Sequence, residues 1–281
     1  MNIIDIIKKR RSVRTFDGTA LRTGDRERII EYAKLADNPY QLPVEWKLLD
    51  GKAQGLSSPV IVGTDLFIAG KMLCRTHAEE AFGYSFEKIV LYAKSIGVGT
   101  TWIAGTMNRS AFERAIELKS GELMPCVSPL GYPAQKMSLR ETVMRNAIKA
   151  DSRLDFGTLF FDKTFATPLL PKKAGVIEKA LDAVRLAPSA VNKQPWRVVI
   201  SGDKAHFYEK RSDRYIQNGR DIQKIDMGIA LCHFELAAAE CGLDTVFEIK
   251  DPGIEVPDKT EYIASYVFKA KEQVCNREKT K

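Results

Sequence analysis

Residues 187–199 read Ala-Pro-Ser-Ala-Val-Asn-Lys-Gln-Pro-Trp-Arg-Val-Val, and this stretch decides how the rest of the chain is interpreted. Apolar residues at helical spacing precede it, at Val176, Ile177, Ala180, Leu181, Val184 and Ala187. Pro188 cannot continue that helix because it has no N–H to donate and clashes with the preceding turn. A β-prone run begins at Trp196. The stretch therefore predicts the end of a helix, a short polar turn and the start of a strand.

The turn carries side chains that bind without charge. Ser189, Asn192 and Gln194 can each donate and accept hydrogen bonds. Such groups suit the polyhydroxy chain and the ring edge of a bound heterocyclic cofactor. Serine and asparagine are also ordinary turn residues, so a connecting loop without a ligand is the alternative. Taken alone, the turn leaves both interpretations open.

The overall composition is that of a soluble globular protein. Hydrophobic residues make up 44% and charged residues 28% of the 281 residues, enough to bury a sizeable core. No apolar run approaches the roughly 20 residues that a membrane-spanning helix needs. The short apolar run 3–7 precedes the basic residues 8–11, which reverses the order of a secretory signal. We therefore expect a cytoplasmic protein with no membrane partner.

The cysteines and histidines give no catalytic or metal-binding pattern. The five cysteines include no Cys-x-x-Cys pair, so we expect reduced thiols, no disulfide framework and no metal site. The three histidines are scattered and form no recognisable set with a nucleophile or a carboxylate. No catalytic side chain can be assigned from the sequence. These residues are Cys74, Cys126, Cys232, Cys241, Cys275, His77, His206 and His233.

The formal charge of +7 is distributed rather than gathered. Outside residues 8–14 and the polar tail 269–281, acidic and basic residues are interspersed, and no basic face interleaved with aromatic residues is present. We therefore expect no nucleic-acid partner. A basic nucleic-acid module is an alternative that would predict strongly salt-dependent DNA binding.

A basic cluster follows the first predicted helix, which covers residues 2–10 and has Ile3, Ile6 and Ile7 on one face. The next residues read Arg10-Arg11-Ser12-Val13-Arg14. Guanidinium groups are planar, forked and always charged, so this cluster can satisfy the several acceptors of a phosphate. An exposed basic turn is the alternative.

The chain contains an internal repeat. A helix at 25–37, a turn at Asn38-Pro39 and a strand at 45–49 through Trp46 repeat the order found around Trp196. A helix at 78–96 ends at Gly97 before a β-prone run at 99–105. The helix at 222–241, apolar nearly all round and hence buried, ends at Gly242 before a strand at 243–247. The sequence thus predicts two diverged copies of one α+β unit.

The remaining predicted elements complete the two copies. They are two β-prone runs within 56–72 around Gly63, a helix at 109–118, a strand at 126–132 and a strand at 262–269. We place the boundary near residue 150, in the polar stretch 146–155. The expected domains are residues 1–150 and residues 151–281.

With the arginine cluster and the polar turn in view, the chain resembles the nitroreductase family of FMN-dependent oxidoreductases. Four segments carry the resemblance: residues 10–14, residues 97–105, residues 130–133 together with Lys136, and residues 187–196. Each match is weak alone and the four together are specific. The resemblance implies an α+β fold with three layers in the order α-β-α.

The chain departs from the family pattern in one respect. The resemblance implies homodimers in which the arginine motif comes from one subunit and the polar loop from the other. Here each motif occurs in one half only, and Leu42 and Val44 stand where Asn192 and Gln194 stand in the second half. We expect two tandem diverged copies that form an intramolecular pseudo-dimer, a monomer mimicking a homodimer. It would keep one composite FMN site, while the symmetry-related site has decayed.

The resemblance also implies roles for particular residues. Arg10, Ser12 and Lys136 would hold the phosphate, and Arg14 would lie at the N1/O2 edge of the ring. Backbone N–H groups of Ala104 and Gly105 would point toward N5. The full expected FMN-binding set is Arg10, Arg11, Ser12, Arg14, Ile103, Ala104, Gly105, Lys136, Pro188, Ser189, Ala190, Asn192 and Gln194.

The implied activity is a two-step redox cycle. NAD(P)H would serve as co-substrate and reduce FMN, after which a flat electrophilic small molecule such as a nitroaromatic or a quinone would accept the reducing equivalents. A non-catalytic flavin- or nucleotide-binding or sensing protein is the alternative. Residues 97–102 do not form a dinucleotide-binding turn, because a third glycine is lacking and the segment leads into a strand rather than a helix.

Overall fold

The computed structural model of the chain describes residues 2–217 and 219–270. Cys275 and most of the polar tail 269–281 lie outside the described residues. The elements of the first half are α1 (Ile3–Lys9), α2 (Thr23–Lys34), β1 (Glu45–Asp50), α3 (Gly51–Gln54), β2 (Leu66–Leu73), α4 (Ala78–Ser95), α5 (Arg109–Ala115), β3 (Glu122–Leu123), β4 (Val127–Pro129) and α6 (Leu139–Ala147).

The second half contains more short elements. They are α7 (Phe156–Leu159), β5 (Phe160–Asp162), η1 (Pro171–Lys173), η2 (Gly175–Ile177), α8 (Glu178–Arg185), η3 (Ala190–Asn192), β6 (Trp196–Ser201), β7 (Lys204–Lys210), η4 (Asp213–Tyr215), β8 (Ile216–Gln217), β9 (Arg220–Asp221), α9 (Lys224–Glu240), β10 (Leu243–Glu248) and β11 (Thr260–Ala270).

Two sheets share one topology. In the first, β2 pairs antiparallel with β1 and with β4, and residues 99–103 add bridges from Gly99 to Gly131 and from Ile103 to Val127. In the second, β7 pairs antiparallel with β6 and β11, and β11 pairs antiparallel with β10. By position in the two sheets, β1 therefore corresponds to β6, β2 to β7, β4 to β11, and residues 99–103 to β10. The expected tandem arrangement of two copies is confirmed.

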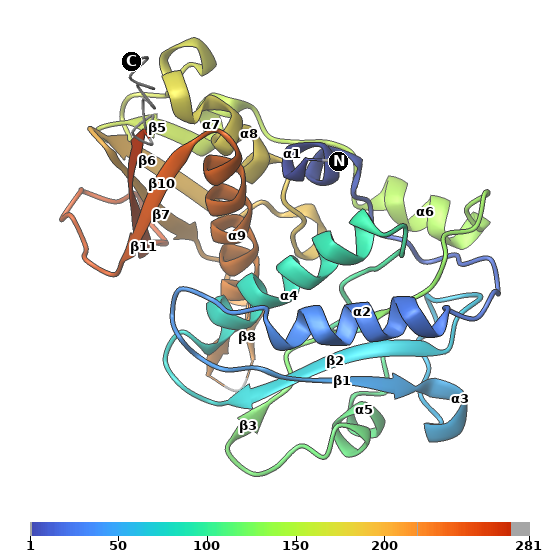
Figure 1. Cartoon of the computed structure of the whole chain (residues 1–281). Coiled ribbons are helices and arrows are strands. Elements are labelled where there is room, and N and C mark those ends of the chain that lie inside the picture. Colours follow the sequence, from blue (N-terminus) through green and yellow to red (C-terminus); the bar gives the residue numbers. More distant parts are fainter. Residues whose placement is uncertain (1, 218, 271–281) are drawn as a thin grey trace, which may run out of the picture.

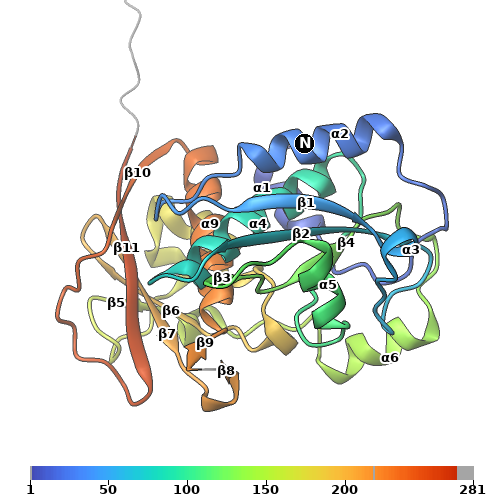
Figure 2. The same ribbon diagram turned by 90° about the horizontal axis from the view of Figure 1, so that it is seen from below.

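Helices cover the sheets and lie between them (Figure 1). In the first half α2 and α4 lie on one face of the sheet and α5 on the other, which is the expected α-β-α layering (Figure 2). In the second half α8 and α9 lie on the face that turns toward α4 (Figure 1). The two copies therefore face each other through their long helices.

The long helices α4 and α9 cross at two glycines, Gly83 and Gly228. A Cβ on Gly83 would collide with the backbone carbonyl of Ile225, and a Cβ on Gly228 would collide with that of Glu80. Each glycine thus packs against the residue three positions before the other glycine. This reciprocity is what a twofold contact requires. The crossing point defines a pseudo-twofold axis that relates residue 83 to residue 228.

The first helix, α1, reaches across to the second half. Ile6 and Ile7 are buried in a hydrophobic cluster formed mainly by residues 159–266, including residues of α8 and α9. Asn2 caps the helix by accepting a hydrogen bond from the Asp5 N–H at 2.9 Å. The chain leaves α1 at Arg10, the C-cap residue. Apolar packing of α1 therefore places the arginine motif at the junction of the two copies.

Several sequence-based predictions of secondary structure were wrong. Residues 56–62 form no strand and Val62 makes a single bridge to Thr15, since Pro59 cannot donate to a ladder. Residues 99–105 form isolated bridges because they bond alternately to the segment 12–13 and to the segment 127–131. Helix α6 and strand β7 were not predicted. Among the described residues, no helix is both long enough and apolar enough to cross a membrane.

Candidate functional site

The arginine motif lies along the edge of the first sheet. The Val13 N–H donates to the Thr100 carbonyl at 2.8 Å, and the Phe16 N–H donates to the Val62 carbonyl at 2.8 Å. Val13 and Phe16 are buried and fix the segment in register. Ser12 forms the bridge to Thr100. The backbone is thus extended, and the neighbouring arginines are held at a defined place.

Arg10 is buried without a full partner. Its side chain is 6% exposed, its Nε lies 3.9 Å from Glu87 Oε1, and that Nε donates no hydrogen bond. Glu87 already accepts a hydrogen bond from Trp102 Nε1 at 3.1 Å and contacts His233 Nε2 at 2.9 Å. Burial lowers the pKa of the Arg10 guanidinium, the Glu87 carboxylate partly offsets this, and nearby Arg145 lowers the pKa further. A buried cation with an unused N–H is costly unless an anion completes it.

Arg10 belongs to a group of four arginines, the arginine cluster, formed by Arg10, Arg14, Arg145 and Arg153. Burial lowers the pKa of Arg14 and of Arg153, and Arg145 lowers both further by charge repulsion. Arg10 also lowers the pKa of Arg153, whose Nε is buried without a hydrogen-bond partner. Four close cations, two with unused N–H groups, fit the charge and the several acceptors of a phosphate.

The acidic neighbours only partly offset this charge. Glu141 is buried and contacts Arg11 Nη1 at 3.1 Å, while accepting from Thr15 Oγ1 at 2.7 Å and from the Arg14 N–H at 3.3 Å. Asp151 pairs with Arg145, but its own side chain is 84% exposed. The cluster therefore keeps an excess of positive charge in a largely buried setting.

Helix α6 brings Arg145 into the cluster. Ser138 caps the helix by accepting from the Glu141 N–H at 3.2 Å, and Glu141 stands three residues later, as in a capping box. Arg145 follows Glu141 by four residues and so shares its face of the helix. Sequence reasoning missed α6, Arg145 and Arg153. The Ser138-x-x-Glu141 signal would have predicted the helix.

The polar loop of the second half is strained. Val191, Asn192 and Gln194 have φ values of 42°, 58° and 51°, in the left-handed region that side-chain-bearing residues rarely adopt. Such outliers gather at binding and catalytic sites, where the surrounding structure enforces them. Here the Gln194 N–H donates to Ser189 Oγ at 2.8 Å, and the Ala190 N–H donates to both Asp226 carboxylate oxygens at 3.1 and 3.2 Å.

The loop meets the arginine cluster through Arg153. Arg153 Nη1 donates to Asn192 Oδ1 at 3.4 Å. Asn192 Nδ2 donates to the carbonyls of Lys149 at 2.7 Å and Ser152 at 3.1 Å, and Gln194 Oε1 accepts from the Leu154 N–H at 2.9 Å. The loop therefore bonds directly to residues 149–154, which already provide hydrogen-bond partners for both amide side chains. That the motif 10–14 and this loop face each other across one FMN site stays a prediction.

Asp226, in the first turn of α9, holds the loop by accepting hydrogen bonds from the Ala190 N–H. It is buried, and burial raises its pKa to about 8, with nearby Asp221 adding to the rise. Burial raises the pKa values of Tyr215 and Cys126, and the nearby Asp226 carboxylate raises both further. The pseudo-twofold relates Asp226 to Ala81, a residue without a charge. The carboxyl group therefore serves only the loop of the second half.

Residues 103–105 lie near the same junction. Ile103 is buried and exchanges backbone hydrogen bonds with Val127, while Ala104 and Gly105 are exposed. Arg109 Nη2 donates to the Ala104 carbonyl at 2.9 Å. Thr100, three residues before Ile103, forms the bridge to Ser12, so this segment begins beside the arginine motif.

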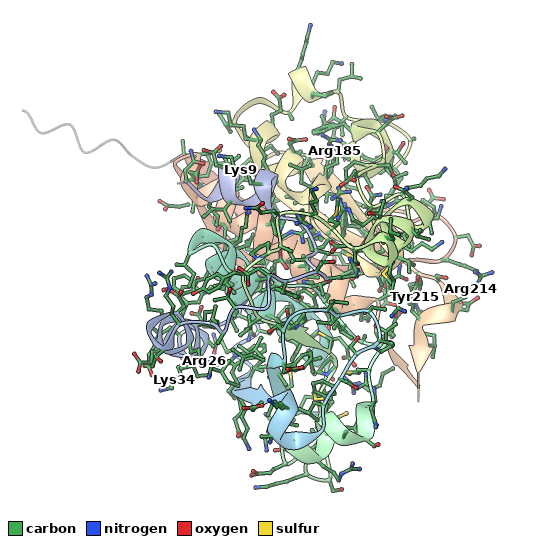
Figure 3. All side chains as sticks on the ribbon, turned by 90° about the vertical axis from the view of Figure 1, so that its right-hand side faces the viewer. Lys9, Arg26, Lys34, Arg185, Arg214 and Tyr215 are labelled. Atoms are coloured by element: carbon green, nitrogen blue, oxygen red, sulfur yellow. The ribbon has the colours of Figure 1, made fainter. Side chains whose placement is uncertain are left out.

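Two residues of the expected FMN-binding set have other surroundings. Lys136, which was expected to hold the phosphate, is exposed. Arg11 contacts Glu141. Other basic residues are spread over separate elements, and Figure 3 labels Lys9 on α1, Arg26 and Lys34 on α2, Arg185 on α8, and Arg214 beside Tyr215 in η4.

Two hollows in the described part of the surface lie away from this junction. One of about 480 Å³ lies beside α1 and α8, and one of about 350 Å³ lies beside residues 39–42. Neither has an expected FMN-binding residue in its lining. The candidate site is therefore defined by unbalanced charge and a strained loop rather than by an open cavity.

Comparison with known proteins places this geometry in a family. The family model described as "Putative TM nitroreductase" matches residues 2–238. The chain belongs to this nitroreductase family. The match spans both copies of the unit, and it confirms the resemblance that the sequence motifs indicated.

Among solved structures, one that covers nearly the whole chain agrees in fold. A "putative nitroreductase" from Thermotoga maritima is 22% identical with a TM-score of 0.62, over 95% of this chain and 94% of that one. A nitroreductase family protein from Clostridium novyi is 21% identical with a TM-score of 0.41, over 48% of this chain and 87% of that one. An FMN-dependent nitroreductase from Clostridium difficile is 19% identical with a TM-score of 0.42, over 48% and 90%. No curated protein matches the chain.

Proposed function

We propose that the protein is an FMN-dependent oxidoreductase that takes hydride from NAD(P)H and reduces a flat electrophilic acceptor, such as a nitroaromatic or a quinone. The observation that carries the proposal is the arginine cluster, whose buried and unused N–H groups meet a strained polar loop in a chain of the nitroreductase family. FMN, when bound, supplies the hydride-transfer chemistry that side chains cannot.

The cluster fits the phosphate of FMN. Arg10 and Arg153 each have a buried Nε–H without a partner, and Arg145 lies beside both. A phosphate near −2 charge would accept these N–H groups and relieve the mutual repulsion of the guanidinium groups. Ser12 and Lys136 remain proposed contacts from the sequence, with Lys136 at the exposed end of the site.

Other residues would orient the ring system. Arg14, which is partly buried, would offer positive charge to the N1/O2 edge, where the ring gains negative charge after hydride transfer. The exposed Ala104 and Gly105 leave room for the backbone to approach a ring closely. Pro188, Ser189 and Ala190 would line it from the loop, held in place by Asp226.

We propose one FMN per chain, with the chain acting as a monomer that mimics a homodimer. Leu42 and Val44 offer no amide in the first half, and residues 155–162 contain no arginine. The boundary near residue 150 remains part of this proposal. The four described cysteines are free, which supports a reducing compartment such as the cytoplasm.

An absorbance spectrum of freshly purified protein tests the proposal. We expect a yellow protein with one flavin per chain, whose visible flavin band bleaches with NADPH and recovers when a quinone is added. Protein that binds no FMN, even after incubation with excess cofactor, would overturn the assignment.

A second candidate is a flavin-binding protein without turnover. It is favoured by one observation: the amides of Asn192 and Gln194 already have partners in residues 149–154. This candidate predicts colour that neither NADH nor NADPH bleaches. The same spectrum, recorded with both nucleotides, separates the two functions.

A further inference from the structure

The pseudo-twofold predicts where a second site would lie. Trp46, the second residue of β1, corresponds to Trp196, the first residue of the equivalent strand β6, so residues 39–42 correspond to the loop residues 189–192. Gly83 and Gly228 at the helix crossing relate residues 102–104 to residues 247–249. The backbone keeps one feature of the loop, since Gln41 has φ 56° where Val191 has φ 42°. The second site should therefore lie between residues 39–42 and the end of β10.

A hollow lies at that place. Its volume is about 350 Å³, within the range of small-molecule sites. Both predicted segments contribute to its wall, one from each copy. The lining residues are Pro39, Tyr40, Gln41, Leu42, Thr76, His77, Phe247, Glu248 and Ile249.

The wall of this second pocket carries three rings. The Tyr40 and His77 rings lie nearly parallel, with centroids 5.1 Å apart and planes 24° apart. The Phe247 ring meets Tyr40 edge-on at 4.9 Å and 71°. Burial raises the pKa of Tyr40 well above its ordinary value, so the phenol stays neutral. Ring faces and edges of this kind favour a flat aromatic ligand.

The charges of the second pocket disfavour a phosphate. Its one charged lining residue, Glu248, is paired with Lys204 Nζ at 2.7 Å, and the buried carboxylate of Glu80 lies 3.2 Å from His77 Nδ1. With Nδ1 turned to Glu80, the imidazole keeps Nε2 as a hydrogen-bonding group for a ligand. A ligand should therefore lack a phosphate and should carry a ring edge that forms hydrogen bonds.

We propose that the second pocket binds a flat, phosphate-free aromatic molecule with a hydrogen-bonding ring edge, independently of the FMN site. Duplication has then turned one of two equivalent places into a pocket with different chemistry. The arginine cluster selects a phosphorylated ligand, whereas Tyr40, His77 and Phe247 select a ring alone.

Lumichrome is a suitable probe, because it has the tricyclic flavin ring and N–H donors but no ribityl phosphate. Protein saturated with FMN is titrated with lumichrome by calorimetry. We expect one lumichrome per chain without release of FMN. No binding to the FMN-saturated protein would overturn the proposal, as would release of one FMN for each lumichrome bound.

Two matched variants separate the sites. Ile249→Trp places an indole at the half-exposed rim of the second pocket and should weaken lumichrome binding at least tenfold while leaving FMN binding unchanged. Ala104→Trp changes the pseudo-twofold equivalent of Ile249 and should weaken FMN binding while leaving lumichrome binding unchanged. Equal lumichrome affinity in wild type and Ile249→Trp would overturn the proposal.

His77→Gln provides a milder variant that keeps a hydrogen-bonding side chain at the wall. It should weaken lumichrome binding severalfold, and an unchanged affinity would remove His77 from the recognition. If the protein takes up no FMN, the proposed function fails. Titration of the ligand-free Ala104→Trp protein with lumichrome then still tests the second pocket, because the first place is blocked.

Discussion

The loops 37–46 and 187–196 occupy equivalent positions and have diverged in chemistry. Each lies before a strand that begins near a tryptophan, and each contains a left-handed residue, Gln41 in one and Val191 in the other. In the first loop Asn38 Nδ2 donates to the Leu42 carbonyl at 2.7 Å and to Ser85 Oγ on α4 at 3.1 Å. The second loop instead bonds to Asp226 and to residues 149–154. The two loops therefore share a left-handed backbone residue but differ in their polar side chains.

The largest effect should come from the element that relates the two loops, the crossing of α4 and α9. Gly83→Ala would force the helices apart against the carbonyl of Ile225 and lower the free energy of unfolding by about 3 kcal/mol. Gly228→Ala should cost a similar amount, because its contact with Glu80 is reciprocal. Chemical denaturation measures both.

Gly24→Ala is the matched control for the crossing. Gly24 lies in α2 with no atom within 4 Å of an added Cβ, so alanine should stabilise the helix by about 0.5–1 kcal/mol. A loss below about 1 kcal/mol for Gly83→Ala would show that the crossing adapts, contrary to a fixed pseudo-twofold.

The next largest effect should come from changes to the arginine cluster, which faces the second loop. Arg10→Ala should weaken FMN binding by roughly 1.5–3 kcal/mol, because it removes a charge-assisted hydrogen bond. Arg145→Ala should have a similar effect, while Lys136→Ala should have little, since Lys136 is exposed. Titration of each apoprotein with FMN measures the difference. A larger effect of Lys136 than of Arg145 would favour the phosphate set inferred from the sequence.

The arginine cluster shows what the sequence could and could not reveal. Periodicity and helix-ending glycines predicted α4 and α9, since a buried helix is apolar on all sides. Arg145 and Arg153 lie in a polar region that composition assigns to a solvated boundary. Their burial arises only when α6 folds back on residues 11–15 and residues 149–154 cover the loop, through contacts between residues 33 to 127 positions apart in sequence. Excess charge at a junction is a property of the assembled fold.

Asp226 supports only the second loop, and its titration should make the stability of the protein depend on pH. Its pKa is about 8 in the folded protein against an ordinary value of 3.8, so the folded protein keeps a proton that the unfolded chain has lost. The free energy of unfolding should therefore fall as pH rises from about 4 to about 8. Asp226→Asn still accepts from the Ala190 N–H and has no such dependence. Relative to wild type it should gain on the order of 1–2 kcal/mol over this range.

Denaturation of wild type and variant at several pH values measures that difference. Glu209 on β7 also has a pKa of about 8 and is present in both proteins, so only the difference between them reports on Asp226. The groups facing Asp226, namely Asp221, Tyr215 and Cys126, are likewise unchanged. A difference that does not change with pH would show that Asp226 is already ionised near pH 4.

An exchange of side chains between the loops should have a smaller effect. Asn192→Leu copies the residue of the first loop and removes the hydrogen bonds to Lys149 and Ser152, so FMN affinity should fall by about 1 kcal/mol. Leu42→Asn should not create a second FMN site, because no arginine cluster faces that loop. The flavin-to-chain ratio measures both variants. Two flavins per chain in Leu42→Asn would contradict the single-site proposal.

The smallest effect should come from the backbone feature that the loops share. Val191 is β-branched, 54% exposed and left-handed, so glycine relieves strain at little loss of packing. The relief of about 1–2 kcal/mol is partly offset by the greater freedom of glycine in the unfolded chain, which leaves a gain of about 0.5 kcal/mol. Gln41→Gly, at the equivalent position, should gain less because glutamine is not β-branched. Thermal unfolding measures both variants. If Val191→Gly is less stable than wild type, then contacts of the Val191 side chain stabilise the loop by more than the left-handed backbone destabilises it.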